Sequence, residues 1–111
     1  MRAGTLDSRI ALYRVVSTPT GTGGMAETEV LVTECWAAFR APRGQEVIEA
    51  GQIVGQVDGI FKIRWLSGVT PGMRIRFDGQ VWDMFHPAPI GGRNAFLELY
   101  ARVLRREGAN G

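Results

Sequence analysis

The stretch "GMRIRFDGQVWDMF", residues 72–85, constrains the fold of this chain more than any other segment. Two alternating apolar and polar runs flank Asp78-Gly79, a dipeptide that favours the two-residue turn of a β-hairpin. That turn predicts the pairs Phe77–Gln80, Arg76–Val81, Ile75–Trp82, Arg74–Asp83 and Met73–Met84. Since paired residues share a face, the apolar pairs form a core side, and Arg74 and Asp83 are expected to form an outward ion pair. The same register turns Phe85 outward unless a bulge intervenes.

Four further segments have the alternation or composition of strands: residues 6–16, 29–40, 60–66 and 95–106. The last of these also fits a helical stripe, but strand is favoured in a chain otherwise built of hairpins. Together with the hairpin they predict a mainly β fold, a small and partly closed antiparallel β-barrel of about six strands. At 111 residues the chain is expected to form a single domain, 1–111, with a frayed tail over 106–111.

Three segments interrupt the β pattern. "STPTGTGGMAET", residues 17–28, is rich in glycine and threonine and predicts a long loop. "HPAPIGGRN", residues 86–94, predicts a second loop. Residues 44–55 predict a short α-helix that leans on the sheet. On a helical wheel its packing face is Val47, Ala50, Gly51 and Val54, and the opposite arc contains Gln45, Glu49, Gln52 and Ile53.

The composition is that of an ordinary globular protein, with 45% hydrophobic residues, 22% charged residues and a formal net charge of +2. That weak charge argues against a dedicated nucleic-acid-binding protein, although it permits a local basic surface. With one cysteine, Cys35, the chain cannot form an intrachain disulfide. The sequence has neither a signal-peptide core nor an apolar run of membrane-spanning length, so we expect a soluble protein without a membrane partner.

No catalytic, cofactor-binding or metal-binding constellation is predicted. Cys35, Asp83 and His86 are the residues that could seed a nucleophilic site, but alternation places Asp83 and His86 on opposite faces. Cys35 is therefore expected to be structural and His86 a loop or surface residue. One histidine and one cysteine cannot complete a tetrahedral metal site. The "GTGG" of residues 21–24 lacks the Lys-Ser/Thr of a phosphate loop and favours a flexible loop.

Four basic residues fall on outward positions of strands expected to be adjacent: Lys62, Arg64, Arg74 and Arg76. One reading is an ordinary solvated barrel exterior. The other is a basic face toward DNA backbone or an acidic protein partner, which would make the chain a small nucleic-acid-binding β-barrel. No exposed aromatic residues are interleaved as a single-strand-binding platform requires. Ile53 and Phe85 are predicted exposed apolar residues and would mark a contact site if they were neighbours.

Several segments in order resemble one known family: "MRAGTLDSRIALYR", "WAAFRAPRGQEVIEAGQ", "FKIRW", "MRIRFDGQVWDM" and "LELYARV". The set spans Met1 to about Val103 and is similar to the bacteriophage head–tail joining proteins, also called head-closure or head–tail adaptor proteins. These occur in tailed phages, prophages and gene transfer agents. The resemblance implies a small β-barrel with a helix inserted after the Trp-Ala strand, and a structural protein without enzymatic activity or cofactor.

The resemblance also implies partners and a location. Copies would form a ring, six- or twelve-fold, at the neck of a virion or phage-like particle assembled in the bacterial cytoplasm. The ring would close the DNA-filled head below a portal or adaptor protein, let double-stranded DNA pass, and dock a tail terminator or tail tube protein. The candidate loop toward a neighbour or the channel contains Thr20, Gly21, Thr22, Gly23, Gly24 and Met25. The candidate contact residues are Glu46, Glu49, Gln52, Ile53 and Phe85.

Overall fold

The structure, a computed structural model, describes residues 6–42, 45–49, 52–92 and 95–106, with backbone alone for 45–49 and 52–55. These residues form eight strands. Their bounds are β1 Ser8–Pro19, β2 Met25–Arg40, β3 Gln45–Glu49, β4 Gln52–Val57, β5 Gly59–Arg64, β6 Met73–Phe77, β7 Gln80–Ile90 and β8 Phe96–Arg106. The mainly β prediction is confirmed, and residues 95–106 are a strand as expected.

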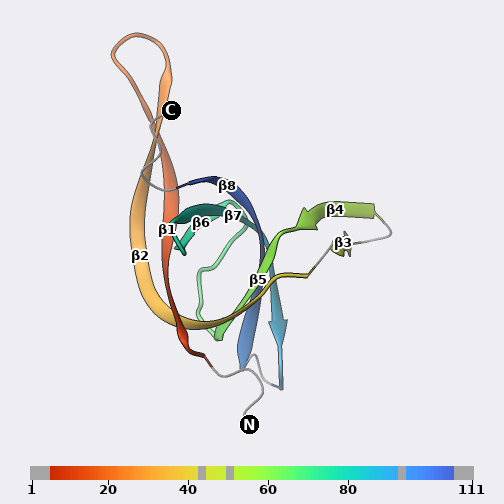
Figure 1. Cartoon of the computed structure of the whole chain (residues 1–111). Coiled ribbons are helices and arrows are strands. Elements are labelled where there is room, and N and C mark those ends of the chain that lie inside the picture. The colour runs from red at the N-terminus through yellow and green to blue at the C-terminus, as the bar shows by residue number, and fades with distance from the viewer. Residues whose placement is uncertain (1–5, 43–44, 50–51, 93–94, 107–111) are drawn as a thin grey trace.

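Six of the strands close into an antiparallel barrel in the order β1-β2-β5-β8-β7-β6. Strands β3 and β4 form a separate two-stranded sheet. Figure 1 shows two hairpins leaving the barrel in different directions, one formed by β1 and β2 and the other by β3 and β4. Closure satisfies the backbone groups of the central strand segments, because each has a ladder on both sides.

The predicted β6–β7 hairpin is confirmed in every one of its five pairs. Asp78 and Gly79 both have positive φ, 55° and 71°, which is the geometry of a type I′ turn. Ile75, Met84 and Trp82 face the barrel interior and are buried. The outward ion pair was predicted wrongly: Arg74 binds glutamates of β2, and Asp83 instead pairs with Arg102 at 3.5 Å.

The barrel interior is a continuous apolar core to which all six strands contribute. Its buried members are Ile10, Leu12, Ala37, Phe61, Ile63, Met73, Ile75, Trp82, Met84, Leu97, Leu99 and Ala101. At one end Phe39, Phe61, Phe77 and Trp82 pack as an aromatic cluster with ring centroids 4.9–6.5 Å apart. Gly59 lies against this cluster, and a Cβ there would come within 2.6 Å of the Phe39 ring and 2.7 Å of Trp82.

The predicted helix over 44–55 is wrong. Its described residues form the antiparallel β3–β4 hairpin, with Glu49 paired to Gln52 and Ile48 to Ile53. The β-branched residues of this segment favour strands, and Gly51 and Gly55 are poor helix formers.

Both predicted long loops are shorter than expected. Strand β1 continues to Pro19 and β2 begins at Met25, so residues 17–28 form the end of a hairpin rather than a loop. Threonine has a high β propensity, and cross-strand pairing outweighs the glycine and proline content of this stretch. Strand β7 likewise continues through His86 to Ile90 and pairs with β8. Of the predicted frayed tail, residues 106–111, Arg106 is the last residue of β8 and pairs with Gln80, and the remainder lies outside the described residues.

Candidate assembly surface

The β1–β2 hairpin extends well past the barrel, and we call residues 13–32 the β1–β2 arm. Tyr13 is the last residue of β1 that pairs with β6. Beyond it, the described part of the chain pairs β1 with β2 alone, up to Pro19 opposite Met25. Where the arm leaves the barrel the register shifts, and Val32 is the extra residue. A bulge bends a strand and increases its twist, so this one redirects the arm.

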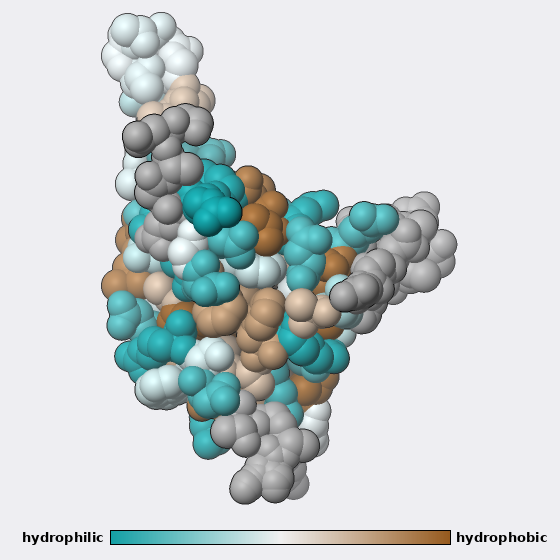
Figure 2. Space-filling model, in the orientation of Figure 1, coloured by the Kyte–Doolittle hydropathy of each residue, from teal (hydrophilic) through white to brown (hydrophobic). Residues whose placement is uncertain are grey.

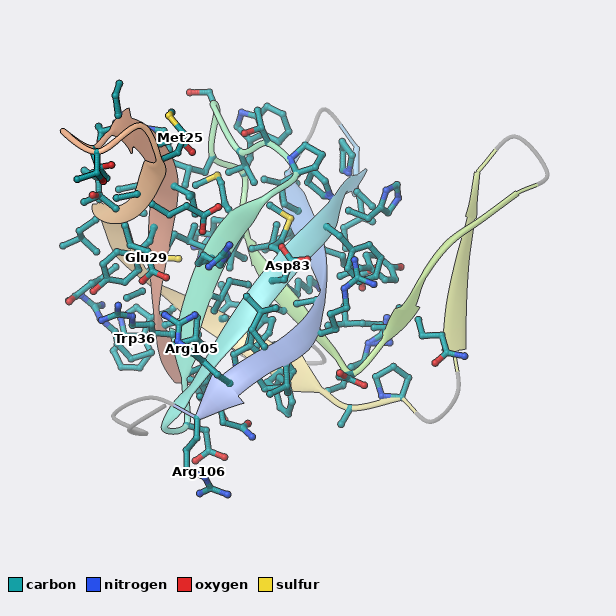
Figure 3. All side chains as sticks on the ribbon, turned by 90° about the horizontal axis from the view of Figure 1, so that it is seen from above. Met25, Glu29, Trp36, Asp83, Arg105 and Arg106 are labelled. Carbon is teal, nitrogen blue, oxygen red and sulfur yellow. The ribbon has the colours of Figure 1, made fainter. Side chains whose placement is uncertain are left out.

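Glu29 fastens the arm to the barrel. Its Oε1 accepts a hydrogen bond from Arg76 at 2.6 Å, and its Oε2 accepts from Arg105 at 3.1 Å and from Arg74 at 3.4 Å. Arg74 also reaches Glu27 at 3.6 Å. Glu29 and Arg105 lie side by side in Figure 3. One carboxylate of β2 therefore joins three guanidinium groups from β6 and β8, and we call these four residues the Glu29 clamp.

The clamp is partly shielded from water, which strengthens it. Burial raises the pKa of Glu29, but hydrogen bonds and charge from Arg76 and Arg105 outweigh burial and bring the pKa below its ordinary value of 4.5. The Arg76 guanidinium also stacks 4.5 Å from the centre of the Tyr13 ring. These contacts hold the arm in one direction relative to the barrel.

The tip of the arm has local hydrogen bonds and lies away from the barrel strands in Figure 1. Thr20 Oγ1 accepts hydrogen bonds from the backbone N–H groups of Gly24 at 3.2 Å and Thr22 at 3.4 Å. Gly23 has φ of 90°, a conformation that favours glycine. Figure 2 shows the tip in pale colours, consistent with its threonines and glycines. Next to it Met25 is 64% exposed, a large apolar side chain presented to solvent.

The predicted basic face is not one surface. Lys62 and Arg64 lie on β5 and Arg74 and Arg76 on β6, and these strands are three places apart in either direction around the barrel. The expectation of adjacent strands is therefore wrong. Arg74 and Arg76 are taken up by the clamp. The Lys62 ammonium lies 4.6 Å from the centre of the Phe96 ring.

The predicted contact residues on the helical arc are now divided between two strands. Glu46 and Glu49 are on β3, and Gln52 and Ile53 are on β4. Their side chains lie outside what the structure describes, so their role stays a prediction. The β3–β4 hairpin, residues 45–57, is called the β3–β4 arm.

The base of the β3–β4 arm packs on the outside of the barrel. Val57 and Ile60 are buried there against Phe85 and Tyr100. Asp58 Oδ2 accepts a hydrogen bond from the Val103 N–H at 3.0 Å. Phe85 lies at a register shift in β7, and Arg102 stacks over its ring at 4.7 Å. Phe85 therefore supports the arm base and is only partly exposed.

The barrel with its two projecting hairpins was compared with known proteins. The sequence model of the phage head completion protein family matches residues 1–104. The chain belongs to this family. The resemblance seen in the ordered motifs is thereby confirmed, and family membership supports a structural, virion-associated component of the phage head–tail region.

Two solved structures have a similar fold. The solution structure of protein SF1141 from Shigella flexneri 2a is 23% identical, with a TM-score of 0.68 over 100% of both chains. A chain in the virion of a native gene transfer agent particle is 20% identical, with a TM-score of 0.64 over 90% of this chain and 96% of that one. At such identities the similarity concerns the fold alone. No curated relative matches the sequence.

The two residues considered for a nucleophilic site, Cys35 and His86, pack against neighbouring side chains of the barrel. Cys35 packs against the core, and burial raises the pKa of its thiol although the charge of Arg9 partly opposes this. His86 pairs with Tyr100, and their rings meet edge to face at 5.5 Å. The bulge at Phe85 brings His86 onto the outer face with Asp83, so the predicted opposition of these two was wrong.

Two further structural findings concern metals and membranes. Among the described residues, no three His, Cys, Asp or Glu side chains gather as a metal site. Within the same residues there is no helix with the length and apolarity to cross a bilayer.

The sequence interpretation missed two features of the outer surface. Trp36 is 51% exposed and, with Leu6, Asp7 and Arg64, lines an open groove near the start of β1. Strand alternation could have found it, since Cys35 and Ala37 face inward and Trp36 must then face out. No sequence pattern could have revealed the Glu29 clamp, because the arginines that bind Glu29 are 45 to 76 residues away from it in sequence.

Proposed function

We propose that this chain is a non-enzymatic subunit of a homo-oligomeric ring at the head–tail interface of a phage or phage-like particle. The ring closes the DNA-filled head below the portal or adaptor and gives the tail a docking surface. The observation that carries the proposal is the β1–β2 arm, which the Glu29 clamp holds away from a closed barrel with an exposed tip. Membership in the head completion family and the fold shared with a gene transfer agent virion chain support it.

The arm suits a ring because a ring needs two different surfaces on each copy. A heterologous contact joins one patch to another patch on the next copy, and repetition closes the circle. A directed hairpin is one such patch, and the barrel wall offers the other. The low net charge of +2 fits a conduit, since each phosphate contact would add affinity that DNA must break to pass.

Nucleic-acid binding through an arginine-rich face is a weaker candidate. Its four residues are split between opposite strands, and two of them already bind Glu29. These four residues therefore do not form a continuous row of cations for a phosphate backbone.

The proposal is tested by shortening the arm without disturbing its anchor. Replacing Thr18–Ala26 with Asn-Gly joins the paired residues Ser17 and Glu27 through a two-residue turn and keeps Glu29 in place. We expect the variant to fold with a melting temperature within about 3 °C of the parent, since the removed residues bury little surface. Particles assembled with it should be tailless, as counted by electron microscopy.

The matched control is Gly21→Ala, which keeps the arm length and adds a methyl group with nothing within 4 Å. It should give tailed particles at the parental yield. Tailed particles at parental yield from the shortened variant would overturn the proposal.

A further inference from the structure

The groove around Trp36 is an interaction surface that the proposed ring leaves unassigned. Trp36 projects from the outer face of β2, and its neighbour across the ladder is Arg9. The Arg9 guanidinium stacks on the indole at 5.2 Å and also pairs with Glu34 at 3.6 Å. Trp65, 43% exposed, directly follows Arg64 of the groove. Half-exposed tryptophans beside arginines are the composition of a protein–protein contact centre.

Arg64 is the cationic side chain of the groove lining that can pair with an anionic group, and Asp7 lines the same groove. The Arg9 guanidinium is already paired with Glu34. The Asp7 carboxylate accepts a hydrogen bond from Ser8 at 3.5 Å. Arg64 is exposed and forms no ion pair with the described acidic side chains. An occupant should therefore bring an apolar group for the indole and a carboxylate for Arg64.

The tip of the β1–β2 arm carries those two groups on one face. Met25 is 64% exposed, and Glu27, two residues on in the same strand, has a side chain that is 62% exposed. Residues i and i+2 of a strand project from the same side. A thioether packs favourably on an aromatic ring. The Glu27 carboxylate has only a loose contact with Arg74 at 3.6 Å and remains open to a second cation.

The arm cannot fill the groove of its own chain. Arg9 pairs with Trp36 and Pro19 with Met25, so the two sites are ten residues apart along β1, on the order of 33 Å. Figure 1 shows the arm tip and the start of β1 at opposite ends of the molecule. Any contact between them must join two copies, and it would be heterologous as a ring requires.

We propose that the arm tip of one copy docks in the Trp36 groove of the next, with Met25 on the Trp36 indole and Glu27 paired to Arg64. This inference rests on the proposed ring and identifies the surface that receives the arm. The contact is partly electrostatic, so it weakens with added salt.

Photo-crosslinking in assembled particles tests where the tip lies. A benzophenone amino acid at position 25 of the full chain should join two copies, and the crosslinked peptide should contain Trp36 or Arg64. Crosslinks that reach a second copy elsewhere would overturn the docking site, as would crosslinks only to another protein. The two experiments can fail separately. If the shortened-arm variant gives tailless particles but position 25 of the full chain crosslinks elsewhere, the proposed function stands and this inference alone is wrong.

A charge exchange tests the ion pair. Glu27→Arg and Arg64→Glu are each expected to lower the yield of tailed particles at least about fivefold, and the double variant should restore most of it. Rescue cannot arise within one chain, because β5 pairs with β2 at Ala38–Arg40, eleven or more residues along that strand from Glu27. The matched control is Arg14→Glu, which changes an exposed arginine that lies on the arm and not in the groove. It should not rescue Glu27→Arg. A double variant no better than the single variants would overturn the pairing.

Discussion

The β1–β2 arm and the β3–β4 arm leave the same barrel but are held by different forces. The first continues two barrel strands and is fixed by a carboxylate among three arginines. The second is a separate sheet joined to the barrel at its base, by a small apolar cluster and the Asp58 hydrogen bond. A two-stranded hairpin is marginally stable alone. The position of the first arm therefore depends on charge, and that of the second on packing next to the core.

The barrel core next to the base of the β3–β4 arm should respond most strongly to substitution. Gly59→Ala puts a methyl group within 2.6 Å of the Phe39 ring and 2.7 Å of Trp82, both part of the aromatic cluster. We expect the free energy of unfolding to fall by about 1–3 kcal/mol, as measured by urea denaturation, because an overpacked core must shift side chains or backbone. Gly92→Ala, with nothing within 4 Å, should change it by less than about 0.5 kcal/mol. Equal effects of the two would show that the core next to the arm base does not pack as described.

The β1–β2 arm should respond to loss of charge with a smaller, more local effect. Glu29→Gln removes the carboxylate charge that the partly buried Arg74 and Arg76 bind and leaves Arg74 with its longer contact to Glu27, and we expect the free energy of unfolding to fall by about 1–2 kcal/mol. Amide hydrogen exchange should accelerate over residues 13–19 and 25–32 and stay unchanged in β5 and β8. Glu34→Gln removes an exposed pair with Arg9 and should cost less than about 0.5 kcal/mol. An equal response to both variants would contradict the special role of Glu29.

The pH dependence of the arm sharpens the same comparison. Because the pKa of Glu29 is lower in the folded state, its contribution is fully present above the ordinary value of 4.5 and is lost as the pH falls through the folded pKa. The protection of amides in the β1–β2 arm of the parent, measured relative to their intrinsic exchange rates at each pH, should therefore fall on acidification below about pH 4.5. In Glu29→Gln this acid-induced loss of protection should be absent.

The parts of the fold that the sequence predicted rest on local signals. Asp78-Gly79 between alternating runs fixed the β6–β7 register, and alternation placed Ile75 and Met84 in the core. Composition gave a wrong prediction where the pairing between strands determines the structure. Glycine and threonine content predicted a loop at residues 17–28, yet cross-strand hydrogen bonds extend the strands to Pro19 and Met25.

The candidate site was less predictable because its contacts are long-range. The helical wheel over residues 44–55 could not reveal that Ile48 pairs with Ile53 across a turn. The basic face required knowing which strands are neighbours, and barrel closure put β5 and β6 on opposite sides. Glu29 meets Arg105 only because β8 returns beside the arm.

Imaging purified particles by electron cryomicroscopy and locating this chain tests the proposed ring directly. We expect a ring of copies at the junction of head and tail, in which the β1–β2 arm of each copy lies against the next. Copies absent from the junction, or a ring in which the arms touch no neighbouring copy, would contradict it.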